Sequence, residues 1–350
     1  MKSKLKSCLL ALLASATVTS FAAPPPGIPD GWSDGYVYAN GIRIHYYHAV
    51  PNPGRPVMVM VHGVTDNGLC WTTLTWKLQD QYDIYMPDTR GHGLSDPFTS
   101  NDNADTLVKD VAEFVRAMKF EKPILMGHSM GAATVMRVGA EYPDLAKAII
   151  MLDPLIGRGG PRPSRARGPQ NQRTGTKSAA RAGEHGATAL ARDAERGDPP
   201  KASKQSPPAR ARLSVNMMGS PETLVAQNNY SYDELVAKAR RENPKWALVD
   251  CEYWALSKKQ YHGAYSGAAW QVMSGVMNTR DSLAKITSPA IILKADAPPE
   301  VRKANEEIAK VMQKGKLVHI DGAGHNLHHD QLERTVKELE EFLSPLRSPQ

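Results

Sequence analysis

Ser129 lies at the centre of a Gly-x-Ser-x-Gly motif and is the residue of this chain best placed to act as a nucleophile. Residues 124–131 read Ile-Leu-Met-Gly-His-Ser-Met-Gly, an apolar strand that runs into the motif and then into a small-residue helix. The two glycines allow a sharp turn, which leaves the Ser129 hydroxyl exposed above a helix N-terminus. A bare match to this motif often arises by chance, but here the strand and the helix that it requires are both present.

A histidine near the other end of the chain is the candidate general base. Residues 316–321 read Lys-Leu-Val-His-Ile-Asp, which indicates a strand, and Gly322-Ala-Gly-His325 follows as a glycine-rich loop. A histidine side chain titrates near neutral pH, so His325 can take the serine proton during attack and return it to the leaving group.

Two backbone N–H groups are candidates for an oxyanion hole. Residues 57–61 form a continuous apolar run, Val-Met-Val-Met-Val, which leads into His62-Gly63-Val64. A loop in this position can aim the N–H of Val64 at the site, and the N–H of Met130 follows the nucleophile directly. These donors, with Ser129 and His325, predict acyl transfer.

These motifs resemble those of the α/β-hydrolase family, and the resemblance covers nearly all of the chain after the first residues, except residues 158 to about 212. The motifs are His62-Gly63, Asp88-Thr-Arg-Gly-His-Gly-Leu-Ser95, Gly127-His-Ser-Met-Gly131 and Gly322-Ala-Gly-His325. The resemblance implies an α/β fold with a helical cap inserted over the nucleophile. We interpret Asp88, Arg90 and His92 as residues that organise a tight turn rather than carry the chemistry.

The acid of the expected triad has two candidates. In most of the family it follows the strand before the last helix pair, here residues 290–294, but Pro298 occupies the expected position and Asp296 lies slightly early. Asp153 ends another apolar strand, at the edge where open α/β sheets build their sites. Haloalkane dehalogenases and zearalenone-type lactonases, as members of the family, carry their acid at about this distance after the nucleophile. We favour Asp153 over Asp296, and either would accept the other ring N–H of His325.

Apolar strands that alternate with helical patterns predict an eight-stranded, mostly parallel sheet covered on both faces. We expect strands over 36–38, 42–48, 57–61, 82–87, 123–127, 148–152, 290–294 and 317–320. We expect helices over 71–79, 105–118, 131–141, 300–313 and 331–342. The first two strands, joined at Asn40-Gly41, predict an antiparallel hairpin at the sheet edge. We expect His45 and His48 in that hairpin to lie on the surface.

Residues 1–22 have the pattern of a signal peptide, which predicts a secreted or periplasmic protein. Lys2, Lys4 and Lys6 precede a short apolar run, and Ser20-Phe-Ala22 supplies small residues for cleavage. The apolar run is too short to cross a membrane, so we expect no stable membrane anchor.

The positions of the cysteines and histidines show whether a disulfide or a metal site is expected. Cys70 and Cys251 can form one disulfide or stay as two free cysteines, and their spacing does not decide between these states. His325, His328 and His329 lie close together, but their loop-and-helix setting does not favour a metal site. We expect neither a metal nor another cofactor.

The net charge of +7 comes from one segment rather than from the folded domain. Residues 158–212 carry thirteen Lys/Arg and four Asp/Glu, and without them and the three lysines of residues 1–22 the net charge is −5. Leu190 is the only large aliphatic residue of the segment and no aromatic residue occurs in it, which predicts a disordered basic linker. Because nothing aromatic is available for base stacking, we expect no nucleic-acid partner.

The remaining sequence divides into a core in two parts and an insertion. We expect residues 23–153 and 287–345 to form the α/β-hydrolase core, with residues 154–286 inserted as the cap. Aromatic residues are frequent between residues 213 and 283, and most of them should form the core of the cap.

Together these features predict a secreted serine hydrolase that cleaves a small hydrophobic ester or lactone through an acyl-enzyme. Serine at the nucleophile position argues against the dehalogenase and epoxide-hydrolase branches of the family, which use a carboxylate there. Carbon–carbon bond hydrolases and cofactor-free haloperoxidases keep the serine and stay open as alternatives. So does a hydrolase-like protein that binds a ligand without turnover.

Overall fold

The computed structural model describes residues 24–156, 227, 229–263, 267–277, 279 and 281–346. The expected signal peptide (1–22) and basic linker (158–212) lie outside the described residues. None of the helices in these described ranges combines the length and the apolar composition that a membrane crossing requires.

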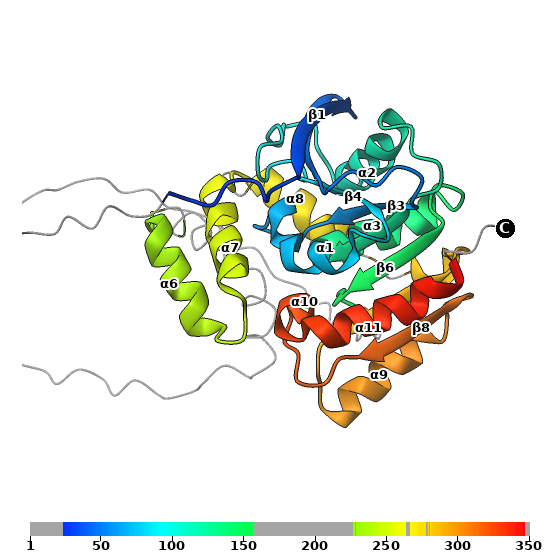
Figure 1. Cartoon of the computed structure of the whole chain (residues 1–350). Coiled ribbons are helices and arrows are strands. Elements are labelled where there is room, and N and C mark those ends of the chain that lie inside the picture. Colours follow the sequence, from blue (N-terminus) through cyan, green and yellow to red (C-terminus); the bar gives the residue numbers. More distant parts are fainter. Residues whose placement is uncertain are drawn as a thin grey trace, which may run out of the picture.

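The described strands form one sheet in the order β1-β2-β4-β3-β5-β6-β7-β8 (Figure 1). They are β1 (Ser33–Ala39), β2 (Ile42–His48), β3 (Val57–Val61), β4 (Asp83–Pro87), β5 (Ile124–His128), β6 (Ala148–Leu152), β7 (Ala290–Lys294) and β8 (Gly315–His319). The β1–β2 and β2–β4 pairs are antiparallel, and the other pairs are parallel. The expected eight-stranded, mostly parallel sheet with an edge hairpin is therefore confirmed.

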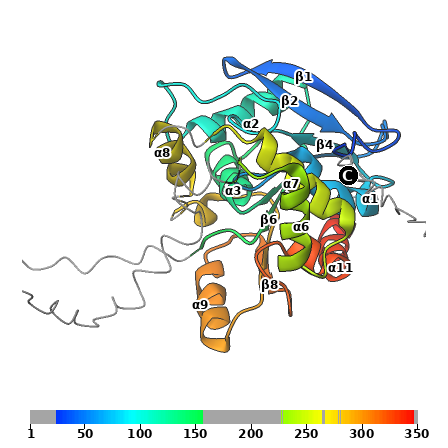
Figure 2. The ribbon, with the colours of Figure 1, turned by 90° about the vertical axis from the view of Figure 1, so that its left-hand side faces the viewer.

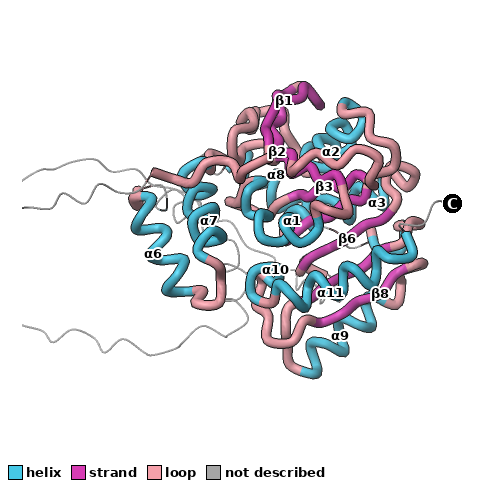
Figure 3. Tube along the Cα trace, in the orientation of Figure 1, coloured by secondary structure: helices cyan, strands magenta, loops and turns pink. Residues whose placement is uncertain are grey.

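Helices cover both faces of this sheet (Figure 3). They are α1 (Thr72–Leu78), α2 (Thr106–Ala117), α3 (Met130–Glu141), α6 (Tyr232–Glu242), α7 (Leu248–Gln260), α8 (Gly267–Val276), α9 (Pro299–Ala309), α10 (Leu327–Asp330) and α11 (Leu332–Leu343). Apolar side chains of α2, α3 and α8 pack in one core cluster, and those of α1 and α11 pack in a second cluster. Because β5 and β6 lie between helices on both sides, all their residues are buried.

Two expected helices differ from the structure at their starts. The helix expected over 71–79 begins as a short 3₁₀ turn, Gly68–Trp71, before α1. The helix expected over 331–342 is preceded by the short helix α10, and Gln331 between them leaves the helical conformation with φ −141°. Backbone propensity does not predict either break, because each depends on tertiary packing.

The helices α6, α7 and α8 lie between β6 and β7 in the sequence, where a cap is expected. Helices α6 and α7 lie side by side on one flank of the molecule, on the left in Figure 1 and facing the viewer in Figure 2. Ala239, Trp246 and Cys251 form a small apolar core between them. Tyr253 of α7 instead belongs to the second cluster, with side chains of α1 and α11, which fixes α7 to the rest of the molecule.

The histidines of the edge hairpin do not lie on the surface, so that expectation is wrong. His45 is fully buried, and its Nδ1 donates to Asp88 Oδ2 at 2.8 Å. Its Nε2 donates to Asp34 Oδ2 at 3.0 Å. His48 is half-buried and donates to Asp83 at 2.7 Å. The loop that carries Asp88 covers this part of β2, which the alternation of residues along the strand does not reveal.

Of the two states open for the cysteines, the structure has the free thiols: Cys70 and Cys251 are both buried and unpaired. Burial raises the pKa of Cys251 to about 11, and burial also raises the pKa of Cys70. Both thiols are therefore protonated and unreactive near neutral pH.

Candidate active site

Ser129 occupies a strained turn between β5 and α3. Its φ is 53° and its ψ is −112°, a region that a residue with a side chain rarely adopts. A Cβ at Gly127 would lie 2.2 Å from the Gly131 carbonyl oxygen, and a Cβ at Gly131 would lie 2.0 Å from the Val61 carbonyl oxygen. Both glycines are therefore required by close backbone packing. The N–H of Ser129 also donates to the Leu152 carbonyl at 2.9 Å, which ties the turn to β6.

A hydrogen-bond relay joins Ser129, His325 and Asp153. The Ser129 hydroxyl donates to Nε2 of His325 at 2.9 Å, and Nδ1 of His325 donates to Asp153 Oδ2 at 2.5 Å. The side chain of His325 is 41% exposed, whereas that of Asp153 is 10% exposed. The relay can accept the hydroxyl proton on the imidazole and stabilise the imidazolium that results.

Asp153 follows β6 in a positive-φ conformation, with φ 44°. Its N–H donates to the Leu293 carbonyl at 2.7 Å, and its Oδ1 accepts the N–H of Ala295 at 3.2 Å. The same Oδ1 forms an ion pair with Lys294. Burial acts to raise the pKa of Asp153, but the hydrogen bond from His325 and the positive charge of Lys294 outweigh it and lower that pKa. The carboxyl group is therefore ionised at neutral pH, as the relay requires.

Asp296, the alternative acid, lies outside the relay. Its Oδ1 accepts from Arg302 at 2.5 Å, and its Oδ2 accepts the N–H of Gly322 at 2.8 Å. Asp296 thus holds the start of the loop that carries His325. The structure brings Asp153, rather than Asp296, into contact with the histidine.

Val64 and Met130, the expected oxyanion donors, lie in the two segments next to the nucleophile. A Cβ at Gly63 would be 3.4 Å from the Cβ of Ser129, so the loop after β3 packs against the nucleophile. Met130 is the first residue of α3, where backbone N–H groups have no partner within the helix. Their action on an oxyanion stays a prediction.

Residues 58–338 match the sequence profile of the Alpha/beta hydrolase family. The chain belongs to this family. The match covers nearly all of β3, the strands from β4 to β8 and the whole relay, so membership in the family inferred from the motifs is confirmed.

Two relatives of this α/β hydrolase have names that specify their activities. Over 98 residues the chain is 35% identical to 2-(acetamidomethylene)succinate hydrolase of Mesorhizobium japonicum, covering 28% of this chain and 35% of that protein. Over 129 residues it is 32% identical to N-formylmaleamate deformylase of Pseudomonas putida, covering 37% of this chain and 47% of that protein. The chain thus spans less than half the length of these relatives.

Solved structures agree on the fold. The crystal structure of E-2-(acetamidomethylene)succinate hydrolase aligns with a TM-score of 0.60 and 19% identity, covering 89% of this chain and 99% of that one. An epoxide hydrolase, CorEH, aligns with a TM-score of 0.59 and 17% identity, covering 90% of this chain and 100% of that one. At these identities the likeness shows the fold alone.

Two lysines support the site, one at Asp153 and one on the loop after β3, and neither was identified from the sequence. Lys294 contacts Asp153, as described above. Lys258 of α7 is 2% exposed, and its Nζ donates to the Thr65 carbonyl at 3.0 Å and to Asp66 at 2.8 Å. It thereby joins the cap region to the loop after β3. Lys294 could have been noticed in the sequence, because it is a charged residue at the end of an otherwise apolar strand. Lys258 could not, because its contact with Asp66 spans 192 residues and has no local pattern.

Buried histidines near the relay are neutral at neutral pH. Burial lowers the pKa of His128 to about 3, and it lowers the pKa of His328 well below the usual value. Nε2 of His128 donates to the His325 carbonyl at 2.9 Å, which fixes the loop of the relay histidine. Within the described ranges, no group of three or more His, Cys, Asp or Glu residues is placed to hold a metal ion.

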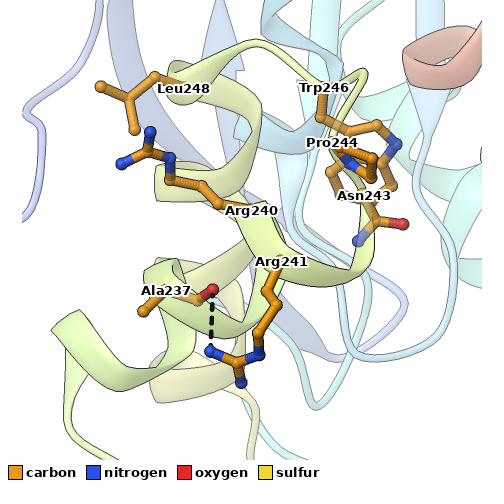
Figure 4. A pocket seen from close by; sticks show the side chains of 7 residues that line it. All are labelled: Ala237, Arg240, Arg241, Asn243, Pro244, Trp246 and Leu248. Atoms are coloured by element: carbon orange, nitrogen blue, oxygen red, sulfur yellow. Dashed lines mark hydrogen bonds between the residues drawn. The ribbon is translucent and has the colours of Figure 1, made fainter.

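A separate hollow of about 540 Å³ opens at the end of α6 (Figure 4). It is lined by two arginines and mostly apolar neighbours: Ala237, Arg240, Arg241, Asn243, Pro244, Trp246 and Leu248. Nε1 of Trp246 donates to Asp330 at 2.7 Å. No lining residue of this hollow belongs to the relay. We place the candidate active site at Ser129, because the relay holds the nucleophile and the base.

Proposed function

We propose that this α/β hydrolase is a serine hydrolase that cleaves a small hydrophobic ester or lactone. The observation that supports this proposal most directly is the relay, in which the hydroxyl of Ser129 lies 2.9 Å from His325 Nε2 and Asp153 lies on the other ring nitrogen. A serine in this arrangement is an activated nucleophile. It is also the wrong group for the epoxide-hydrolase branch, which uses a carboxylate there.

The proposed reaction is acyl transfer in two halves. Ser129 attacks the substrate carbonyl while His325 takes its proton, and Asp153 stabilises the imidazolium. The N–H groups of Val64 and Met130 bind the oxyanion of the tetrahedral intermediate. His325 then protonates the leaving alcohol. Water attacks the acyl-enzyme in the second half and gives its proton to His325. His325 passes that proton to the oxygen of Ser129 as it leaves, which releases the acid and restores the free enzyme.

A second candidate is hydrolysis of an N-acyl group. The names of the two relatives above specify an acetamido group and an N-formyl group, and their matched segments are 35% and 32% identical to this chain. The same relay would serve, with the nitrogen as leaving group. Amide cleavage depends more strongly than ester cleavage on protonation of the leaving group by the histidine.

A substrate panel tests both candidates. Short and long p-nitrophenyl esters, lactones and N-acyl amides are offered to the parent protein and to Ser129→Ala. We expect turnover of at least one ester or lactone by the parent and none by the variant. Turnover confined to N-acyl amides would favour the second candidate. Absence of turnover in the whole panel, together with binding of a hydrophobic ligand, would favour a non-catalytic binding protein.

We also propose that residues 1–22 direct the protein to the periplasm or the medium. The basic and apolar pattern of these residues supports this. Expression of the full chain in a bacterial host, followed by fractionation and mass measurement, tests it. We expect a mature chain in the exported fraction that begins near residue 23, whereas a full-length cytoplasmic chain would contradict the proposal.

A further inference from the structure

Lys294, at the end of β7, shares the carboxylate of Asp153 with His325. Its ammonium forms an ion pair with Asp153 Oδ1 and also donates to the Pro154 carbonyl at 2.9 Å. The side chains of Lys294 and Asp153 are only 13% and 10% exposed. The two oxygens of the Asp153 carboxylate thus have different partners. Oδ1 pairs with the ammonium group of Lys294, and Oδ2 accepts the imidazole N–H of His325 at 2.5 Å.

The position of Lys294 follows from the placement of the acid. Asp153 lies at the end of β6, and β7 is the neighbouring parallel strand, paired through Leu152 and Leu293. Any side chain at the last position of β7 therefore lies beside the acid. In this chain that residue is a cation, whereas Asp296, two residues later, contacts Arg302 and Gly322 instead.

We propose that Lys294 is a positioning residue that makes the relay work at lower pH. Its fixed positive charge offsets part of the negative charge that Asp153 presents to His325. The imidazolium is consequently stabilised less, and His325 becomes available as a base at a lower pH than it would with a free carboxylate. This proposal rests on the proposed function, because it concerns the same relay.

Three other histidines near the relay carry little charge near neutral pH. Burial lowers the pKa of His128, whose ring centroid lies 4.7 Å from that of His325, and the pKa of His328 on α10. Burial, followed by the charge of Arg302, lowers the pKa of His319 on β8. These three histidines are neutral at neutral pH. The charged groups beside the relay are then Asp153 with Lys294, and the ion pair between Asp66 and Lys258, whose two charges offset each other on the loop after β3.

The test compares pH profiles of kcat/KM for Lys294→Met, Lys294→Gln and Lys294→Arg on an ester that the parent hydrolyses. We expect the acidic limb to move to higher pH, by about one unit, in both neutral variants. It should stay near the parent position in Lys294→Arg, which restores the charge. Lys316→Met on β8 is the matched control, because Lys316 is 45% exposed and pairs with Glu338, outside the relay. It should leave the profile unchanged.

An acidic limb that stays in place in both neutral variants would overturn the proposal, whatever happens to kcat, since it would make Lys294 a purely structural residue. If Lys294→Met does not fold, Lys294→Gln carries the test, because its amide can still donate to Pro154. If the parent has no turnover, the proposed function fails separately. The NMR titration of the His325 ring then decides about Lys294: its midpoint should rise in Lys294→Gln, and an unchanged midpoint would contradict the inference.

Discussion

His45 and His325 both donate from Nδ1 to a carboxylate, yet their surroundings differ in the feature that catalysis needs. His45 is fully buried, and its second ring nitrogen donates to Asp34 at 3.0 Å. His325 is 41% exposed on its side chain, and its second ring nitrogen meets the hydroxyl of Ser129 at 2.9 Å. Both rings are held by an aspartate, but only one faces a group that can give up a proton.

The difference shows that a histidine–aspartate pair by itself does not indicate an active site. With an aspartate on each ring nitrogen, His45 links the β1–β2 hairpin to the loop of Asp88. Burial acts to lower the pKa of His45, but hydrogen bonds and charge from Asp88 and Asp34 outweigh burial and raise it. A histidine whose protonated form is favoured, and whose two ring nitrogens are both occupied by carboxylates, is a poor general base. His325 instead keeps one nitrogen for a proton that it can accept and release.

The largest expected effect is at the nucleophile. Ser129→Ala should lower kcat by a factor on the order of 10⁴ or more, because it removes the group that attacks. The melting temperature should stay near that of the parent, since alanine fits the same turn. Steady-state kinetics on the best substrate of the panel measure the loss. Hydrolysis at a near-parent rate would show that the relay is not the catalytic group.

Asparagine substitution at the two candidate acids separates their roles. Asp153→Asn should lower kcat by a factor on the order of 10³ to 10⁴, because an amide can hold the histidine in the wrong tautomer. Asp296→Asn should lower it by less than about tenfold, through a looser histidine loop. The pair serves as its own matched control, since each variant loses one carboxylate. A larger loss in Asp296→Asn would reverse the assignment of the acid.

Substitution of the buried histidine should act on stability instead of activity. His45→Phe removes the histidine between Asp88 and Asp34, and Asp88 keeps only the N–H groups of Gly68 and Leu94. We expect the free energy of unfolding to fall by about 3 kcal/mol. The kcat of the folded fraction should stay within a few-fold of the parent. His48→Phe, in the same strand, is the control and should cost less, because His48 is only half-buried. Chemical denaturation measures both, and a selective loss of kcat in His45→Phe would break the distinction between the two pairs.

The smallest expected effect is the pH dependence of the free energy of unfolding. The contributions of His45 and His128 to it have opposite signs. The pKa of His45 is raised on folding, so its contribution is fully present below pH 6.5 and is lost as the pH rises through the raised value. The pKa of His128 is lowered to about 3, so its contribution is present above pH 6.5 and is lost as the pH falls toward 3.

Thermal melts of the parent and His45→Phe between pH 5 and 9 test this sign. The difference in melting temperature should be largest on the acidic side and should shrink toward pH 9. A difference that grows as the pH rises would mean that His45 is neutral in the folded protein.

The sequence was sufficient for the fold and for the choice of Ser129 and His325 as candidates, because each of these residues lies in a local motif, although their contact spans 196 residues. A strand, two glycines and a helix define the turn at Ser129, and continuous apolar runs define the central strands. The burial of His45 depends on Asp88, 43 residues away, and therefore had no local signal. The choice between Asp153 and Asp296 likewise required coordinates, because both follow parallel strands whose ends meet at one edge of the sheet.

Covalent labelling tests the central claim, that the relay activates Ser129 as a nucleophile, most directly. The parent protein is treated with a fluorophosphonate and analysed by intact mass and by peptide mapping. We predict one adduct per chain, located on Ser129, absent in Ser129→Ala and formed much more slowly in Asp153→Asn. No adduct in the folded parent, or an adduct that persists in Ser129→Ala, would contradict the account.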